Sequence, residues 1–507
     1  MNILLKSVTI VNGNTKSLHL KKRDILIKNG VIDAIETKIE PSGNTKVIDI
    51  KNLHVSVGWF DSGVSFGEPG YEERETIENG LLTAAKSGFT DVILNTSSYP
   101  TPDSSSDIVY LKNAAKNQLT GLHPLGNLTV KGDGEVLAEL YDMKNAGALG
   151  FYDYKHPMEN ANLLKIALQY AQNFEGLVFS FPSDKSISGK GIVNEGITST
   201  KLGLKGIPAL AEELQIARDL FILEYTGGKL FIPTISTASS VKLIADAKKK
   251  GLQVFCSVAA HNLVITDSAL EDFDTQYKVM PPLRTAADMK ALQKGVKNGT
   301  IDFVTSDHTP LNVELKHVEF DNADFGTIGL ESTFGMLNEL LDVEDTIELL
   351  TKGRSVFGMK EPELKVGQPA NLSLFTTDDV YEFSEDQILS SSKNSIAIGK
   401  PMKGKVVGTI ANISYLTILG AIIALSMNNE PQYRFARIHT RQAFGLHLMF
   451  HGFALFSSVW FNQYGLYGLY LCYIVLWVYG FIGALSNKEQ IVPIVGPYFQ
   501  KWFTFIK

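Results

Sequence analysis

Between residues 57 and 361, short apolar runs rich in β-branched residues alternate with longer runs of helical character, and this alternation constrains the fold more than any other feature. The runs expected to form strands include Gly88–Leu94, Lys229–Ile235, Gln253–Val258 and Ile301–Thr305. Helical stretches such as Ser239–Lys250 and Ala286–Asn298 lie before or after them. Because strands that alternate with helices form parallel sheets, the pattern predicts an α/β fold, a (β/α)8 TIM barrel over residues 57–361. Barrel enzymes do their chemistry at the carboxyl ends of these strands.

The composition changes sharply at Ile410. From there onward the chain is strongly apolar and aromatic and carries six basic and two acidic residues, whereas the preceding part carries 41 basic and 52 acidic residues. The acidic balance of the first part argues against nucleic-acid binding. The two cysteines, Cys256 and Cys472, provide no disulfide framework, as expected in a reducing cytosol. The N-terminus has neither the basic start nor the long apolar core of a signal peptide.

Residues 410–507 are predicted to form a helical membrane domain. Its apolar segments are residues 410–427, 444–461 and 466–485, which approach or reach the length of a membrane-spanning helix. Three arginines between residues 434 and 441 favour a cytoplasmic position for the loop after the first segment. A single crossing by that segment would then place the barrel outside the cell. We therefore expect a membrane-associated chain with a cytoplasmic barrel and a first segment that is interfacial or re-entrant.

The stretch Val57–Glu78, VGWFDSGVSFGEPGYEERETIE, resembles the signature that opens the barrel of dihydroorotases, within the cyclic amidohydrolase family. In that signature a buried strand ends in Asp-x-His-x-His, and Arg-Glu-Pro-Gly follows. The positions that match are Gly58, Asp61, Glu68, Pro69 and Gly70. The positions that depart are Gly63 and Ser65 at the two metal-binding histidines and Gly67 at the substrate-binding arginine. Further matches, including SDHTP at Ser306–Pro310, extend the resemblance over roughly the first four-fifths of the chain.

The resemblance implies a metal site at the strand ends, and this chain lacks its four histidines. Their positions hold Gly63, Ser65, Phe181 and Thr234. The remaining candidate metal ligands are the carboxylates Asp61, Asp153 and Asp307. Asn95 matches the substrate-binding asparagine, and Asp307 would be catalytic if the site were active. We expect no cofactor, with a divalent zinc, manganese or magnesium ion only if the site has been rebuilt from carboxylates. Without a metal, Asp307 needs a cation or hydrogen-bond donors as partners.

Two further parts of the chain carry resemblances. The β-rich residues 1–56 and 362–409 resemble the small β-sandwich that amidohydrolases build from both chain ends. Residues 410–507 resemble a small bacterial membrane-domain family of unknown function, itself distantly similar to a chloroplast protein-import component. That match lies in ARIHTRQAFGLHL and GALSNKEQIVPIVG. It implies no known chemistry.

Three functional hypotheses follow. The first is a catalytically inactive dihydroorotase-like protein of pyrimidine biosynthesis, which acts as a scaffold or regulatory partner of aspartate carbamoyltransferase and forms homo-oligomers. The second is an active, metal-dependent cyclic amidohydrolase, of dihydroorotase or allantoinase type, with a carboxylate-rich site. The third is a ligand sensor tethered to the membrane by its tail.

Overall fold

The computed structural model describes residues 2–11, 17–43 and 45–411 and scattered residues between 441 and 503. The chain divides into two compact units, Met1–Asn412 and Ile413–Lys507. The predicted apolar segments 410–427, 444–461 and 466–485 lie largely outside the described residues. In the part that is described, no helix has both the length and the apolar character needed to cross a membrane.

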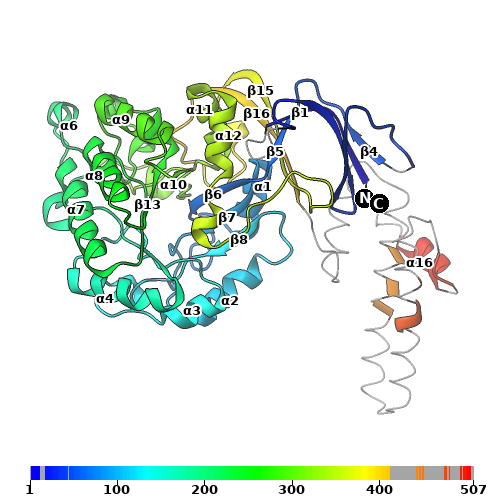
Figure 1. Ribbon diagram of the computed structural model, residues 1–507, viewed down its shortest axis with the longest axis horizontal. Helices are drawn as coiled ribbons and strands as arrows, with labels where there is room; N and C mark the ends of the chain where they lie inside the picture. The colour runs from blue at the N-terminus through cyan, green and yellow to red at the C-terminus, as the bar shows by residue number, and fades with distance from the viewer. Residues whose placement is uncertain are drawn as a thin grey trace, which may run out of the picture. The chain divides into compact units, whose positions relative to one another are not determined.

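Parallel strands form the centre of the first unit (Figure 1). They are β6 (Trp59–Val64), β7 (Phe89–Leu94), β8 (Gly121–Pro124), β9 (Leu177–Phe179), β12 (Lys229–Ile232), β13 (Val254–Ala259) and β14 (Phe303–Thr305). One sheet has the order β6-β7-β8 and the other the order β14-β13-β12-β9. Phe151 joins the two sheets, since it forms parallel bridges to Gly126 and to Val178. On the other side, the Ser65 amide donates to the His308 carbonyl at 2.7 Å. Seven strands and the Phe151 bridge therefore complete a ring of eight positions, and the predicted α/β class is confirmed.

Helices surround this ring (Figure 1). The longer ones are α1 (Ile77–Lys86), α2 (Ser105–Ala114), α3 (Leu140–Ala146), α4 (Ala161–Ala171), α7 (Ala209–Thr226), α8 (Ala238–Lys249), α9 (Ala286–Lys297), α11 (Leu330–Leu340) and α12 (Val343–Thr351). The short elements are α5 (Lys185–Ser188), α6 (Ile197–Leu202), α10 (Val313–Lys316), β10 (Val193–Asn194) and β11 (Gly206–Ile207). Helix α9 begins at a capping box in which Thr285 and Asp288 each accept from the other's backbone amide. The helices predicted over Ser239–Lys250 and Ala286–Asn298 are confirmed to within one residue at each end.

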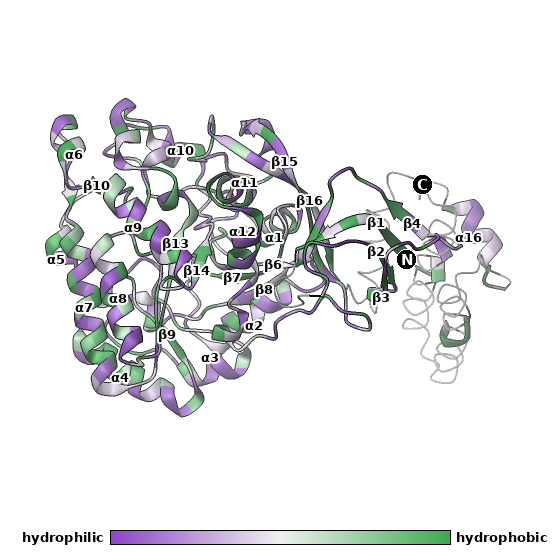
Figure 2. Cartoon of the chain, turned by 45° about the horizontal axis from the view of Figure 1, so that its top comes forward, coloured by the Kyte–Doolittle hydropathy of each residue, from purple (hydrophilic) through white to green (hydrophobic). Residues whose placement is uncertain are grey.

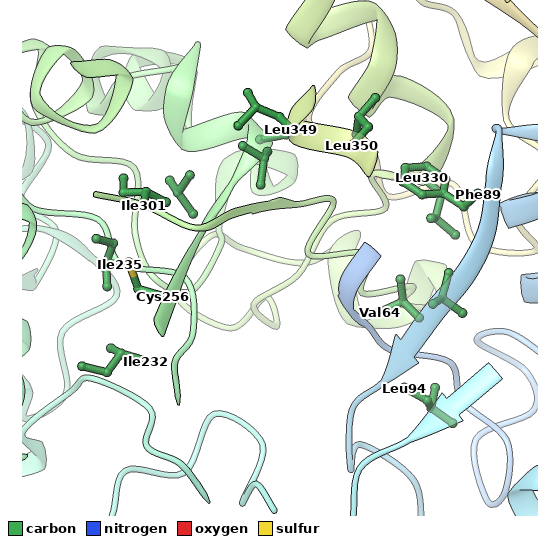
Figure 3. Packing of buried hydrophobic residues seen from close by; sticks show 14 of the residues in the cluster. Val64, Phe89, Leu94, Ile232, Ile235, Cys256, Ile301, Leu330, Leu349 and Leu350 are labelled. Atoms are coloured by element: carbon green, nitrogen blue, oxygen red, sulfur yellow. The ribbon is translucent and has the colours of Figure 1, made fainter. Parts of the chain in front are cut away.

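Alternation along the strands separates two apolar layers. In β12, Leu230 and Ile232 belong to the outer layer under the helices, whereas Phe231 belongs to the cluster inside the ring. Figure 3 shows part of the outer layer, where Ile232, Ile235 and Cys256 lie close together. The inner cluster is largely aromatic and contains Phe60, Tyr152, Phe179, Phe181, Phe231, Phe303 and Phe357. Stacked rings link neighbouring strands, with centroids 4.5 Å apart for Phe179 and Phe231.

Both ends of the first unit contribute to a second sheet (Figure 2). Its strands are β1 (Asn2–Ile10), β2 (Lys22–Lys28), β3 (Val31–Glu36), β4 (Thr45–Ile48), β5 (His54–Val57), β15 (Asn371–Glu382) and β16 (Pro401–Ala411). The order is β16-β15-β5-β1-β2-β3, and β4 also pairs with β1. The residues predicted to form the β-sandwich lie in one hydrogen-bonded mixed sheet, in which β1 pairs with β4 through Asn2–Leu5 and with β5 through Thr9 and Ile10.

Little of the second unit is described. Helix α16 (Gly496–Trp502) contributes Phe499 to a small apolar cluster with Leu446 and Val492. The Val492 amide donates to the Gln442 side-chain oxygen. These contacts show that segments about 50 residues apart in the sequence pack together within this unit.

Candidate functional site

A buried ion pair lies at the carboxyl ends of the barrel strands. Asp307 follows β14, and Lys155 follows the bridge residue Phe151. The Lys155 Nζ is 3.1 Å from the Asp307 Oδ2, and the two side chains are 14% and 4% exposed. The carboxylate that resembles a metal ligand of dihydroorotases therefore has an ammonium group of this chain as its partner.

Tyrosines position the Lys155 amine. The Lys155 backbone amide donates to the Tyr152 hydroxyl at 3.1 Å, and the Nζ lies 5.2 Å from the centre of the Tyr154 ring. The Tyr154 hydroxyl in turn lies 3.1 Å from Thr309 Oγ1. Burial disfavours the charged amine, but the Asp307 carboxylate and Tyr154 together raise the pKa of Lys155 above its ordinary value. Lys155 therefore stays protonated beside Asp307.

Asp61 closes the barrel between its first and last strands. Its carboxylate accepts hydrogen bonds from the Gly63 amide at 3.0 Å, from Thr305 Oγ1 and from the Ser306 amide at 2.9 Å. Burial raises the pKa of Asp61, and these hydrogen bonds oppose the shift. The carboxylate joins β6 to β14, which is a structural role.

Asp153 is bound by a different segment. Its carboxylate accepts from the amides of Leu128 and Thr129, at 2.9 and 3.0 Å, and from the Thr129 hydroxyl at 2.7 Å. Burial raises the pKa of Asp153, and its hydrogen bonds with Thr129 oppose the shift. Asp153 fixes the loop after β8 and makes no hydrogen bond to Lys155 or Asp307. The three predicted metal ligands therefore have three separate sets of partners.

Asn95 faces the positions where the family places its first two histidines. Its Nδ2 donates to Ser65 Oγ at 3.3 Å. A Cβ added to Gly63 would lie 3.6 Å from the Asn95 amide atoms and 3.6 Å from Thr305 Oγ1, which is ordinary van der Waals contact. A methyl group fits at Gly63, but its neighbours leave little room for a ring.

The other two histidine positions are buried in different surroundings. Phe181 is part of the inner aromatic cluster and is 3% exposed. Thr234 has a φ of +48° and its amide donates to Ser257 Oγ at 3.0 Å. Asp307 has a φ of +46°. A β-branched residue in this region is a strained outlier, so the surroundings of Thr234 impose its conformation.

Little space remains between these groups. A cavity of about 20 Å³ is lined by Ser62, Gly63, Asn95, Tyr152, Tyr154, Lys155, Phe179, Phe231, Pro233, Thr234, Ser257, Thr305 and Asp307. Such a volume is close to that of one water molecule, whereas pockets for organic ligands measure about 300–1,000 Å³.

His261 and His308 lie near the strand ends but are structural. Burial lowers the pKa of His261 to about 3 and that of His308 to about 4. The His308 Nδ1 accepts from the amide of Gly329 at 3.2 Å, which places its proton on Nε2. Both residues are neutral at physiological pH.

Gly67, at the position of the family's substrate-binding arginine, has no room for a side chain. A Cβ added there would lie 1.7 Å from the Tyr71 carbonyl oxygen. Its amide also donates to the Glu75 carbonyl at 2.9 Å. The backbone of this turn is therefore incompatible with an arginine.

Comparison with known proteins identifies the family to which the chain belongs. Residues 54–240 match the family model described as dihydro-orotase-like. A dihydroorotase from Pelotomaculum thermopropionicum is 36% identical over 417 residues, which cover 81% of this chain and 97% of that protein. A dihydroorotase from a Geobacter species is 35% identical over 420 residues and covers the same share of this chain. The chain belongs to the dihydroorotase-like family.

Solved structures agree with this fold. L-hydantoinase from Arthrobacter aurescens has a TM-score of 0.70 at 23% identity and covers 81% of this chain and 95% of its own length. Dihydropyrimidinase from Brevibacillus agri has a TM-score of 0.68 at 21% identity. At these identities, the likeness supports the fold alone.

The metal that the resemblance implies does not fit the residues present. Across the described residues, no three His, Cys, Asp or Glu side chains are grouped so that they could hold a metal ion. Catalytic zinc is held by three protein ligands. Here the ammonium of Lys155 occupies the approach to Asp307, and hydrogen bonds within the protein engage Asp61 and Asp153.

Lys155 was not predicted from the sequence. The partner that Asp307 was expected to need lies 152 residues earlier in the chain. A signal was present, since Lys155 is a basic residue two positions after Asp153, near the end of the fourth barrel position. Spacing alone did not show that its side chain turns into the barrel mouth.

Proposed function

We propose that this chain is a non-catalytic dihydroorotase-like protein. The observation that carries the proposal is the buried Lys155–Asp307 ion pair at the strand ends, beside a cavity of about 20 Å³. Hydrolysis of a cyclic amide needs an activated water molecule and room for the ring. The Asp307 carboxylate is engaged by the Lys155 ammonium and not by a metal-bound water, and the cavity has no room for a substrate ring.

The groups that could hold an anionic substrate at this site are lost or already engaged, since the Lys155 ammonium is paired with Asp307. Gly67 replaces the arginine and cannot be substituted without moving the backbone. Asn95 supplies one amide, which already donates to Ser65. The neutral His261 and His308 offer no positive charge.

As its role, we propose a scaffold or regulatory partner of aspartate carbamoyltransferase in pyrimidine biosynthesis. Family resemblance supports this partner. The test is to mix the purified full-length chain with the aspartate carbamoyltransferase of its own organism and to measure the mass of the complex by light scattering. We expect a stable complex and a change in the assembly state of the carbamoyltransferase. Two separate, unaltered species would overturn the scaffold role.

We further propose that the apolar tail associates with a membrane and that the barrel remains on the cytoplasmic side. The apolar sequence of residues 410–507 supports this. Separation of a cell lysate tests it. The full-length chain should sediment with membranes and should be released by detergent but not by carbonate at high pH. Recovery in the supernatant without detergent would contradict it.

A second candidate function is a ligand sensor, and one observation favours it. A separate cavity of about 380 Å³ is lined by Gly132, Asp133, Gly134, Glu135, Asp153, His156, Pro157, Glu159, Asn160 and Lys185. Its volume is in the range of small-molecule sites. A thermal-shift screen of pyrimidine intermediates tests this function, since a ligand that binds the folded state raises the unfolding temperature. No shift with any of them would remove this candidate.

A further inference from the structure

The outer face of helix α9 carries a row of lysines. Lys290, Lys294 and Lys297 are all exposed. With 100° between successive helical residues, the three side chains fall within an arc of about 60°. Asp288 lies on the opposite side of the helix, where it forms the capping box and accepts from the Ala238 amide at 2.9 Å. The outward face of α9 therefore carries charge of one sign.

Helix α8 extends this row, since α8 and α9 lie side by side on the outside of the barrel (Figure 1). A Cβ added to Gly295 of α9 would lie 3.0 Å from Val241 Cγ1 of α8, so the two helices meet closely at this point. Both helices follow strands of one parallel sheet and run in the same direction. The residue after Val241 and the residue before Gly295 therefore turn to the same side of the helix pair. The resulting set of exposed side chains, called the basic stripe below, is Lys242, Lys290, Lys294 and Lys297.

The charge of the basic stripe is not compensated within the described part of the chain, where no carboxylate forms an ion pair with its four lysines. The lysines at the end of α8 differ, because each is paired with a carboxylate at 3.1 Å or less, namely Lys248, Lys249 and Lys250. Residues 1–409 as a whole carry 41 basic and 52 acidic residues. The basic stripe is thus opposite in sign to the unit on which it lies.

Helix stability does not account for the basic stripe. Like charges three or four residues apart destabilise a helix, and Lys294 has such a neighbour on each side. The helix dipole favours cations in the last turn, which accounts for Lys294 and Lys297. Lys242 and Lys290 lie before the last turn of their helices and gain nothing from the dipole. An anionic surface outside the chain would offset this repulsion.

The residues around the basic stripe indicate what kind of anion it fits. Proteins that bind single-stranded nucleic acid stack bases on aromatic or arginine side chains, and protein interfaces centre on tryptophan, tyrosine and arginine. The other exposed residues of α9 and its end are small or uncharged, namely Ala286, Ala287 and Asn298. Lysines without such anchors suit the diffuse charge of anionic lipid head groups. We propose that the basic stripe binds an anionic lipid surface, an inference that rests on the membrane association proposed above.

Lysine acetylation tests the contact directly. The full-length protein is reconstituted into vesicles of phosphatidylcholine alone or mixed with phosphatidylglycerol, and a water-soluble reagent acetylates its lysines for peptide mass spectrometry. One lysine near an anionic surface gains about fivefold in partitioning, so the four lysines should react about tenfold more slowly on the phosphatidylglycerol vesicles. High salt should remove this difference, because the screening length falls to about 3 Å at 1 M. Lys51 and Lys116, exposed on other elements, should react equally on both vesicles.

Charge reversal provides a second measurement. In the triple variant with Lys290→Glu, Lys294→Glu and Lys297→Glu, the unchanged Lys242 should lose its protection on phosphatidylglycerol vesicles. The matched control reverses three exposed lysines away from the stripe, Lys51, Lys116 and Lys131, and should keep the protection of Lys242. Thermal unfolding of both variants shows that the fold is intact, as expected for exposed positions.

Flotation of the vesicles separates this inference from the proposed association of the tail. A chain that floats with both kinds of vesicle but shows equal acetylation rates would overturn the lipid contact of the stripe alone. Flotation with phosphatidylglycerol vesicles alone, abolished by charge reversal, would support the stripe and overturn the tail association. Flotation with neither would overturn both. Protection that requires RNA or an acidic protein in place of lipid would also overturn the proposal.

Discussion

Replacement of Lys155 by methionine should strongly destabilise the barrel. Methionine keeps the volume of the side chain but removes the charge, so the Asp307 carboxylate would remain 4% exposed without a cationic partner. Two unit charges 3.1 Å apart interact by about 5 kcal/mol at an effective dielectric constant of 20. Loss of one partner of a buried pair costs about 3–5 kcal/mol, because the other charge is left buried. We expect Lys155→Met to lower the free energy of unfolding by about that amount.

A double-mutant cycle isolates the ion pair. Lys155→Met, Asp307→Asn and the double variant are compared with the wild type by chemical denaturation. The double variant should be more stable than the sum of the single effects predicts, by at least about 2 kcal/mol, since neither buried charge then remains. Lys229→Met breaks the exposed pair with Glu175 and should cost no more than about 1 kcal/mol. Additive effects of the two substitutions, or a Lys155→Met protein as stable as the Lys229→Met control, would show that the Lys155–Asp307 pair does not stabilise the barrel.

Three further predictions concern single residues. The free energy of unfolding of Gly63→Ala should lie within about 1 kcal/mol of the wild-type value. Gly67→Ala should lower this free energy by about 3 kcal/mol or more, because its Cβ would lie 1.7 Å from a carbonyl oxygen. Equal stability of the two variants in urea titrations would contradict this. Burial and the charge of Lys278 lower the pKa of Lys316 to about 7. Between pH 7 and 9 the Lys316 amine is therefore protonated in the unfolded chain but releases its proton in the folded chain. The stability of the wild type relative to Lys316→Met should therefore rise by about 2 kcal/mol over that interval, and a constant difference would argue against a depressed pKa. Burial and the nearby Asp302 raise the pKa of the Cys256 thiol to about 12. Iodoacetamide should therefore label Cys256 only after the protein unfolds. Rapid labelling of the native protein, detected by peptide mass spectrometry, would be inconsistent with a buried thiol.

Local patterns in the sequence predicted most of the barrel. The period of the apolar residues placed strands at β7, β12, β13 and β14, because buried parallel strands are continuous apolar runs. Apolar periodicity placed no strand at the fourth barrel position, which only the resemblance around Asp153 indicated. This position consists of the single bridging residue Phe151, which is too short to leave a pattern.

The site was less predictable than the fold. Resemblance located Asp61, Asp153 and Asp307, but the function of each carboxylate depends on partners that are far away in the sequence. Thr305, for example, is 244 residues from Asp61, and their hydrogen bond depends on closure of the ring. The second sheet shows the same limit. Its strands were expected, but the pairing of β1 with two successive strands depends on register rather than composition.

The most direct test of the account is the rate of dihydroorotate ring-opening by the purified full-length protein, measured with Zn²⁺ or Mn²⁺ supplied and again after treatment with a chelator. We expect no turnover above buffer under any of these conditions and an unfolding temperature that neither metal nor chelator changes. Turnover that requires metal and is abolished by Asp307→Ala would contradict this expectation, since Asp307 would then be a metal ligand and not the partner of Lys155.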